Sequence, residues 1–147
     1  MPIYHGTTLA NAVKIEKDGY LKPHWELFKI DKNNGKWNGI FFSKKLMPAM
    51  FYSSINNNYN HYNHKSVEPA VILVLSKSSL NYEEIFKTTY KFYYHSNERV
   101  PITSMKYFYY YTHGNPEIRS SWKKMEYKKG IFKKLYKKEN LNINLNR

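Results

Sequence analysis

Because the sequence contains no cysteine, chemistry in this chain must use the oxygen and nitrogen groups of its side chains and its backbone. A disulfide framework, a thiolate zinc site, an iron–sulfur cluster and a cysteine nucleophile are therefore excluded together. The common glycine-rich nucleotide fingerprints are absent, and no serine lies in a nucleophile elbow. His61 and His64 lie in an Asn-rich stretch without periodicity, so we expect no metal site there. Any phosphate or nucleotide binding must use another design.

Four short blocks contain the remaining chemically interesting residues. They are Tyr4-His5-Gly6-Thr7, Gly19-Tyr20-Leu21, Gly39-Ile40-Phe41-Phe42-Ser43 with Ala49 and Tyr52 behind it, and Asn97-Glu98-Arg99-Val100-Pro101-Ile102. In this order and spacing they resemble the ADP-ribosyltransferase superfamily, in the branch shared by poly(ADP-ribose) polymerases and diphtheria-toxin-like enzymes. The resemblance runs from Ile3 to about Tyr109. It implies NAD as co-substrate, cleavage of the nicotinamide–ribose bond, and mono-transfer of ADP-ribose to a macromolecule.

The resemblance implies that the block at residues 4–7 and the block at residues 39–43 bind NAD. His5 matches the histidine that binds the nicotinamide-side ribose, and Gly6, followed by Thr7, matches the glycine whose backbone binds the carboxamide. A Cβ at Gly6 would obstruct that approach. The strand from Gly39 to Ser43 matches a strand whose tyrosine flanks the nicotinamide, but this chain has Phe41 there. Phe41 can pack on a ring without donating a hydrogen bond.

The same resemblance assigns the other site residues. Ala49 matches a small residue of the nicotinamide pocket, and Tyr52 matches the aromatic residue that stacks on nicotinamide, although ordinary helix packing would also explain Tyr52. Glu98 matches the catalytic glutamate, whose carboxylate stabilises the oxocarbenium character that develops at the ribose. A strand-end salt bridge is the structural alternative for Glu98. Ser96 stands where relatives carry Glu or Gln for the acceptor, which leaves the acceptor class open.

The chain is strongly basic, with 24 Lys and Arg against 11 Asp and Glu and a net charge of +13. We therefore expect an acidic macromolecular acceptor: DNA, RNA or a protein bound to them. Paired lysines after residue 120, with Lys123, Lys124 and Lys128 as the first candidates for acceptor binding, predict a basic C-terminal helix and tail. A solvated helix face explains the same lysines without a partner.

At 147 residues, the chain is expected to form a single domain, residues 1–147, of α+β class: an ADP-ribosyltransferase-like, split, antiparallel-rich sheet with flanking helices. Strands are predicted at 2–5, 39–43, 71–75, 87–94, 99–102 and 105–112. Helices are predicted from Leu9 to a left-handed cap at Gly19, over 45–55, within 80–86 and over 122–136. Residues 22–38 and 56–68 are predicted loops, the first with short helical pieces, and 140–147 a frayed tail.

Two other functions are compatible with this sequence. One is a catalytically silent protein of the same fold that binds nucleic acid or inhibits a partner, which the loss of tyrosine at Phe41 favours. The other is an NAD-dependent RNA 2′-phosphotransferase. That family binds the RNA phosphate with several arginines, and this chain has only three, Arg99, Arg119 and Arg147, which disfavours it. With no recognisable export signal or membrane span, we expect a cytoplasmic protein of the producing or a target cell. A toxin or phage effector, with a neutralising partner protein, fits this size and resemblance.

Overall fold

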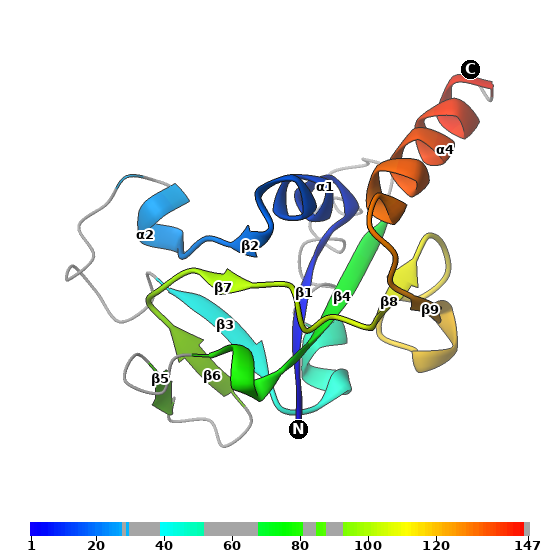
Figure 1. Cartoon of the computed structure of the whole chain (residues 1–147). Coiled ribbons are helices and arrows are strands. Elements are labelled where there is room, and N and C mark those ends of the chain that lie inside the picture. The colour runs from blue at the N-terminus through cyan, green and yellow to red at the C-terminus, as the bar shows by residue number, and fades with distance from the viewer. Residues whose placement is uncertain (28, 30–38, 52–67, 81–84, 88–92, 146–147) are drawn as a thin grey trace.

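The computed structural model describes residues 1–27, 29, 39–51, 68–80, 85–87 and 93–145 (Figure 1). The strands are β1 (Pro2–Thr8), β2 (Tyr20–Leu21), β3 (Ile40–Ser43), β4 (Ala70–Ser76), β5 (Ile85–Lys87), β6 (Tyr93–Ser96), β7 (Val100–Pro101), β8 (Tyr107–Tyr111) and β9 (Trp122–Glu126). Seven of them form one sheet in the order β5-β6-β3-β1-β4-β8-β9, and neighbouring strands pair antiparallel. β2 and β7 form a separate antiparallel pair. The predicted α+β class with an antiparallel-rich sheet is confirmed.

Strand β4 lies inside the sheet, as its unbroken apolar run predicts, because a strand covered on both faces needs apolar side chains at every position. Its side chains alternate between two clusters. Leu73 packs with Phe108 on one face, whereas Ile72 packs with Tyr109 on the other. The hydrophobic core is therefore divided by the sheet into two layers.

Helices cover both faces of the sheet. The first layer contains residues of α1 (Leu9–Asp18) and α4 (Ile131–Leu145), with Leu9, Ala12 and Phe132 among its buried side chains. Residues 46–51 are helical, and Ala49 and Met50 belong to the second layer. In Figure 1, α1 lies beside the start of α4, whose C-terminal half projects beyond the sheet. A bond from the Tyr127 hydroxyl to Glu16 Oε2 of α1, 2.7 Å long, holds the segment before α4 against α1.

The ends of α1 follow the local sequence. Thr8 caps the N-terminus by accepting a hydrogen bond from the Asn11 amide at 3.1 Å, and Gly19 ends the helix with a left-handed φ of 84°. The left-handed cap at Gly19 confirms the sequence prediction. The strand predicted at 2–5 is longer in the structure, because Gly6 and Thr8 continue β1 and pair with Ile72 and Ala70 of β4. Pairing with β4 extends the strand up to the helix cap.

The predicted helix over 122–136 is wrong in its first half. Trp122 to Glu126 form β9, which pairs along its length with β8, and α4 begins only at Ile131. Gly130 separates the two elements with a left-handed φ of 92°. Lys123 and Lys124 therefore lie on a strand, with side chains on alternate faces, and Lys128 lies in the connection.

Two further predictions need correction. Ile85 and Phe86 belong to strand β5 rather than to a helix over 80–86, because they pair with β6. The tail predicted to fray is helical as far as Leu145. Tyr52, His61, His64 and Arg147 lie outside the described residues. Within the residues that the structure describes, no helix combines the length and apolar character needed to cross a membrane.

Candidate functional site

A cavity of about 680 Å³ opens between β1, α1, β2, the short helix α2 (His24–Leu27) and the start of β3. Its volume lies within the range of small-molecule and cofactor sites, roughly 300–1,000 Å³. The described residues lining it are His5, Gly6, Thr7, Asn11, Lys14, Ile15, Asp18, Tyr20, Leu21, Lys22, His24, Leu27, Gly39, Ile40 and Phe41. Residues 5–7, 20–21 and 39–41, from three of the four blocks singled out in the sequence, thus line the same cavity.

A side-chain hydrogen bond joins these two blocks. His5 Nδ1 lies 2.8 Å from the backbone oxygen of Phe41, 36 residues away. Because a carbonyl oxygen only accepts, Nδ1 is the donor, and in the neutral ring Nε2 is then an acceptor. Removal of the half-buried ring from water lowers the pKa of His5, although the bond to Phe41 opposes this shift. The ring is therefore held in one orientation and one tautomer at neutral pH.

A second histidine holds the start of β3. The Gly39 amide donates to His95 Nε2 at 2.9 Å, and the His95 ring lies 4.7 Å from the Phe41 ring between centroids. Burial lowers the pKa of His95, so its ring is neutral and can accept this bond. A Cβ on Gly39 would collide with the His95 ring and the Ser96 carbonyl oxygen. Only glycine allows β6 to approach β3 this closely.

Glu98 follows β6 in a tight turn, and its side chain is half-buried. Ser96 pairs with Ile40, a residue of the cavity wall, so the turn lies beside the start of β3. The Ser96 hydroxyl donates to the Glu98 carbonyl at 3.0 Å and accepts from the Glu98 amide at 3.3 Å. The backbone of Glu98 is thus held at both of its polar groups.

The structure does not bring every predicted site residue to this cavity. Ala49 is buried in the layer on the opposite face from Leu73, and Ser43 is buried with its hydroxyl donating to the Lys45 carbonyl at 2.7 Å. Ser96 is only 1% exposed, so its hydroxyl shapes the turn before Glu98 rather than facing an acceptor. Among described residues, these three and Glu98 are not part of the cavity lining. The prediction for Tyr52 lies outside the described residues.

The lysines predicted to bind an acceptor are exposed, but they do not share one helix. We define the basic unit as the exposed lysines of β9, the following connection and α4: Lys123, Lys124, Lys128, Lys129, Lys133, Lys134, Lys137 and Lys138. Between residues 122 and 140 the carboxylates are Glu126 and Glu139, and Glu139 accepts a bond from the Tyr110 hydroxyl at 3.1 Å. The basic unit is therefore strongly positive.

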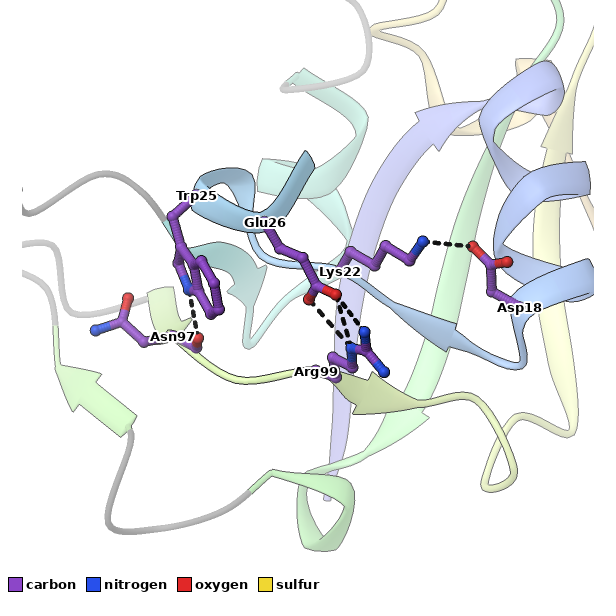
Figure 2. Close-up of polar contacts among 6 residues, drawn as sticks. All are labelled: Asp18, Lys22, Trp25, Glu26, Asn97 and Arg99. Atoms are coloured by element: carbon purple, nitrogen blue, oxygen red, sulfur yellow. Dashed lines mark hydrogen bonds and ion pairs between the residues drawn. The ribbon is translucent and has the colours of Figure 1, made fainter. Parts of the chain in front are cut away.

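Sequence reasoning missed the contribution of α2. Residues 22–38 were expected to be mainly a loop, and Trp25 and Glu26 were given no role there. In the structure His24 and Leu27 line the cavity, while Trp25 and Glu26 contact the turn that contains Glu98 (Figure 2). The apolar residues Trp25, Leu27 and Phe28, close together among turn-forming residues, were the available signal.

The lowered pKa values of His5 and His95 predict a pH dependence of stability. Because the native pKa values of His5 and His95 lie below the ordinary value of about 6.5, the unfolded chain binds more protons near and below that pH. The free energy of unfolding should fall as pH drops from about 6.5 and level off below the native pKa values. Each unit of pKa difference contributes about 1.4 kcal/mol.

Urea unfolding between pH 7.5 and 5 measures this effect. His95→Gln, which retains an acceptor for the Gly39 amide, should have a flatter profile than the unmutated protein. His113 is exposed, so His113→Gln is the matched control and should leave the profile unchanged. A flat profile for the unmutated protein over this range would contradict the prediction.

Comparison with known proteins adds no relative to this description. No family model matches the chain, and a search of curated proteins finds no match. Among the described residues, no group of three or more His, Asp or Glu side chains could hold a metal ion. The features of the described residues that bear on function are the cavity, the Glu98 turn and the basic unit.

Proposed function

We propose that the chain is an NAD-dependent mono-ADP-ribosyltransferase. The observation that carries the proposal is the convergence of the blocks 5–7 and 39–41 on one cavity, joined by the bond from His5 Nδ1 to the Phe41 carbonyl. Glu98, from the fourth block, lies in the turn that follows the partner strand of β3. A histidine and a glycine in the cavity lining, with a carboxylate in the adjoining turn, suit the binding and cleavage of NAD.

The cavity residues have separable roles in this reaction. Gly6 is buried in the wall and lacks a side chain, so its backbone can meet the carboxamide of nicotinamide, while Nε2 of His5 can accept from a ribose hydroxyl. Phe41 offers an aromatic face without a hydroxyl. Lys14 and Lys22 also line the cavity and suit phosphate groups, with Lys22 Nζ 3.4 Å from Asp18 Oδ2.

The chemistry is the transfer of a glycosyl group. The bond between the nicotinamide nitrogen and the ribose carbon breaks, its electron pair leaves with neutral nicotinamide, and the ribose gains oxocarbenium character. The Glu98 carboxylate stabilises that charge and orients the 2′-hydroxyl. An acceptor oxygen or nitrogen then bonds to the ribose carbon and loses its proton.

The basic unit supports a polyanionic acceptor, namely nucleic acid or a protein bound to it. Its eight lysines are exposed, and α4 packs in the same core layer as α1, one of the helices that line the cavity. Phosphate backbones bind such surfaces by releasing counterions, so association should weaken as salt increases. The cavity and the basic unit would then serve the two substrates.

Incubation with NAD labelled in the adenylate moiety tests the proposal. The unmutated protein should release nicotinamide and transfer label to DNA, RNA or protein in a lysate that contains all three. Separate digestion with nucleases and protease then identifies the acceptor class. Neither nicotinamide release nor labelled polymer, with acceptors of all three classes present, would reject the transferase.

The second candidate function is nucleic-acid binding without catalysis, and the basic unit is the observation that favours it. Salt-sensitive binding to nucleic acid without any affinity for NAD would select this function. The RNA 2′-phosphotransferase is less well supported, because Arg99 binds Glu26 and Arg119 donates to the Trp122 carbonyl at 2.7 Å. Both described arginines therefore have structural partners, and neither lines the cavity.

A further inference from the structure

The one-turn helix α2 contacts the turn that contains Glu98 through two adjacent side chains. Trp25 Nε1 donates to the Asn97 carbonyl at 2.7 Å. Arg99 Nε donates to both carboxylate oxygens of Glu26, at 2.9 and 3.1 Å, and a terminal nitrogen of Arg99 binds Glu26 as well. Figure 2 shows both contacts reaching from α2 to the same short segment.

These contacts fall on either side of Glu98. Asn97 is held by Trp25 and Arg99 by Glu26, while the Ser96 hydroxyl binds the amide and carbonyl of Glu98 itself. Three consecutive residues are thus anchored, and two of the anchors come from an element 72 and 73 residues away. Such anchoring restricts the position of the Glu98 backbone more than the turn alone would.

The same helix is also part of the cavity. His24 and Leu27, which bracket Trp25 and Glu26, line it. The β2–β7 pair, with Leu21 opposite Val100, joins the chain before α2 to the chain after Glu98, and the Arg99 guanidinium lies 4.5 Å from the Tyr20 ring centroid. Element α2 therefore links the cavity wall to the Glu98 turn.

We propose that Trp25 and Glu26 are positioning residues that hold Glu98 at the correct distance from the ribose of NAD bound in the cavity. This inference rests on the proposed function, since it assigns Glu98 the role described above. Catalysis is sensitive to such placement, because a displacement of about 1 Å can reduce the rate about 100-fold. The Glu26–Arg99 pair is exposed on the arginine side, with 54% of that side chain accessible, so its contribution to folding is small.

The experiment compares Glu26→Gln and Trp25→Phe with the unmutated protein in NAD consumption, thermal unfolding and amide exchange. Glu26→Gln removes the charge at nearly constant volume, and Trp25→Phe removes the donor to Asn97 while retaining an aromatic ring. Each variant should lower kcat about 10-fold or more, change KM for NAD less than threefold, and shift Tm by only a few degrees. Exchange at the amides of residues 97–99 should become faster in both.

Two controls separate positioning from general destabilisation. Glu117→Gln changes an exposed carboxylate near β9, away from α2, and should retain the full kcat. The charge-reversed pair Glu26→Arg with Arg99→Glu should recover much of the kcat that each single reversal loses, because the ion pair is re-formed.

The outcomes distinguish this inference from the proposed function. If the unmutated protein consumes no NAD, the transferase proposal fails and the positioning role fails with it. If the unmutated protein consumes NAD but Glu26→Gln and Trp25→Phe both keep its kcat, only the positioning role is rejected. A fall in kcat that is matched by a large loss of Tm, with no recovery in the charge-reversed pair, would also overturn it.

Discussion

Glu98→Gln should reduce NAD turnover by at least about 100-fold while leaving the affinity for NAD within a fewfold of the original. The substitution preserves the size of the side chain and the Ser96 bonds, which involve only the backbone of residue 98. It removes the negative charge that, in the proposed reaction, stabilises the oxocarbenium-like ribose. Because the positive charge on the ribose develops in the transition state, loss of the carboxylate should lower kcat rather than the affinity for NAD.

Nicotinamide release measures kcat, and calorimetric titration with NAD measures affinity. Glu117→Gln serves as the control for loss of one exposed carboxylate and should behave as the unmutated protein. Turnover by Glu98→Gln within threefold of the original would remove Glu98 from the chemistry. It would leave open a strand-end role for this residue, for which thermal unfolding of the same variant is the readout.

Gly39→Ala should lower the free energy of unfolding by about 2–3 kcal/mol, the largest stability effect that we expect from adding one methyl group. The new Cβ would overlap the His95 ring and the Ser96 carbonyl oxygen. The carbonyl belongs to β6 and cannot rotate away as a side chain could. Relief requires separation of β3 from β6, which would also weaken the Gly39 amide bond to His95.

Urea unfolding of Gly39→Ala checks this prediction, with Gly130→Ala as the matched glycine control. Gly130 has a left-handed φ of 92° but open space around its Cβ position, so its replacement should cost only about 1 kcal/mol of backbone strain. Gly39 also lines the cavity, so Gly39→Ala should weaken NAD binding in the folded protein. Equal free energies of unfolding for Gly39→Ala and Gly130→Ala would mean that the contact between β3 and β6 is not what destabilises Gly39→Ala.

The cavity and the basic unit differ in how they depend on the fold. The cavity forms only when β1, β3, α1 and α2 are packed in their native positions, because its lining comes from all of them. The lysines of the basic unit are charged and exposed wherever the local chain folds, and they suit a polyanion through charge more than through shape. Mutations in the core should therefore affect NAD turnover before they affect association with a polyanion.

Several features of this protein were predictable from the sequence because they depend on near neighbours. Thr8 and Gly19 mark the ends of α1, since capping involves residues within one turn of the helix. The apolar run of β4 predicts a strand buried on both faces. The blocks around His5 and Glu98 were also recognisable in the sequence as candidate site residues.

Other features were decided only by contacts between distant segments. The residues of β9 have apolar spacings that also suit a helix, and pairing with β8 makes them a strand. The bond from His5 to the Phe41 carbonyl joins residues 36 apart, and the contacts of Trp25 and Glu26 with the Glu98 turn span more than 70 positions. Residue types and local periodicity thus indicated which side chains could take part in chemistry. Strand register and helix docking decided which of them meet, because those depend on hydrogen bonds and packing between segments that local sequence does not specify.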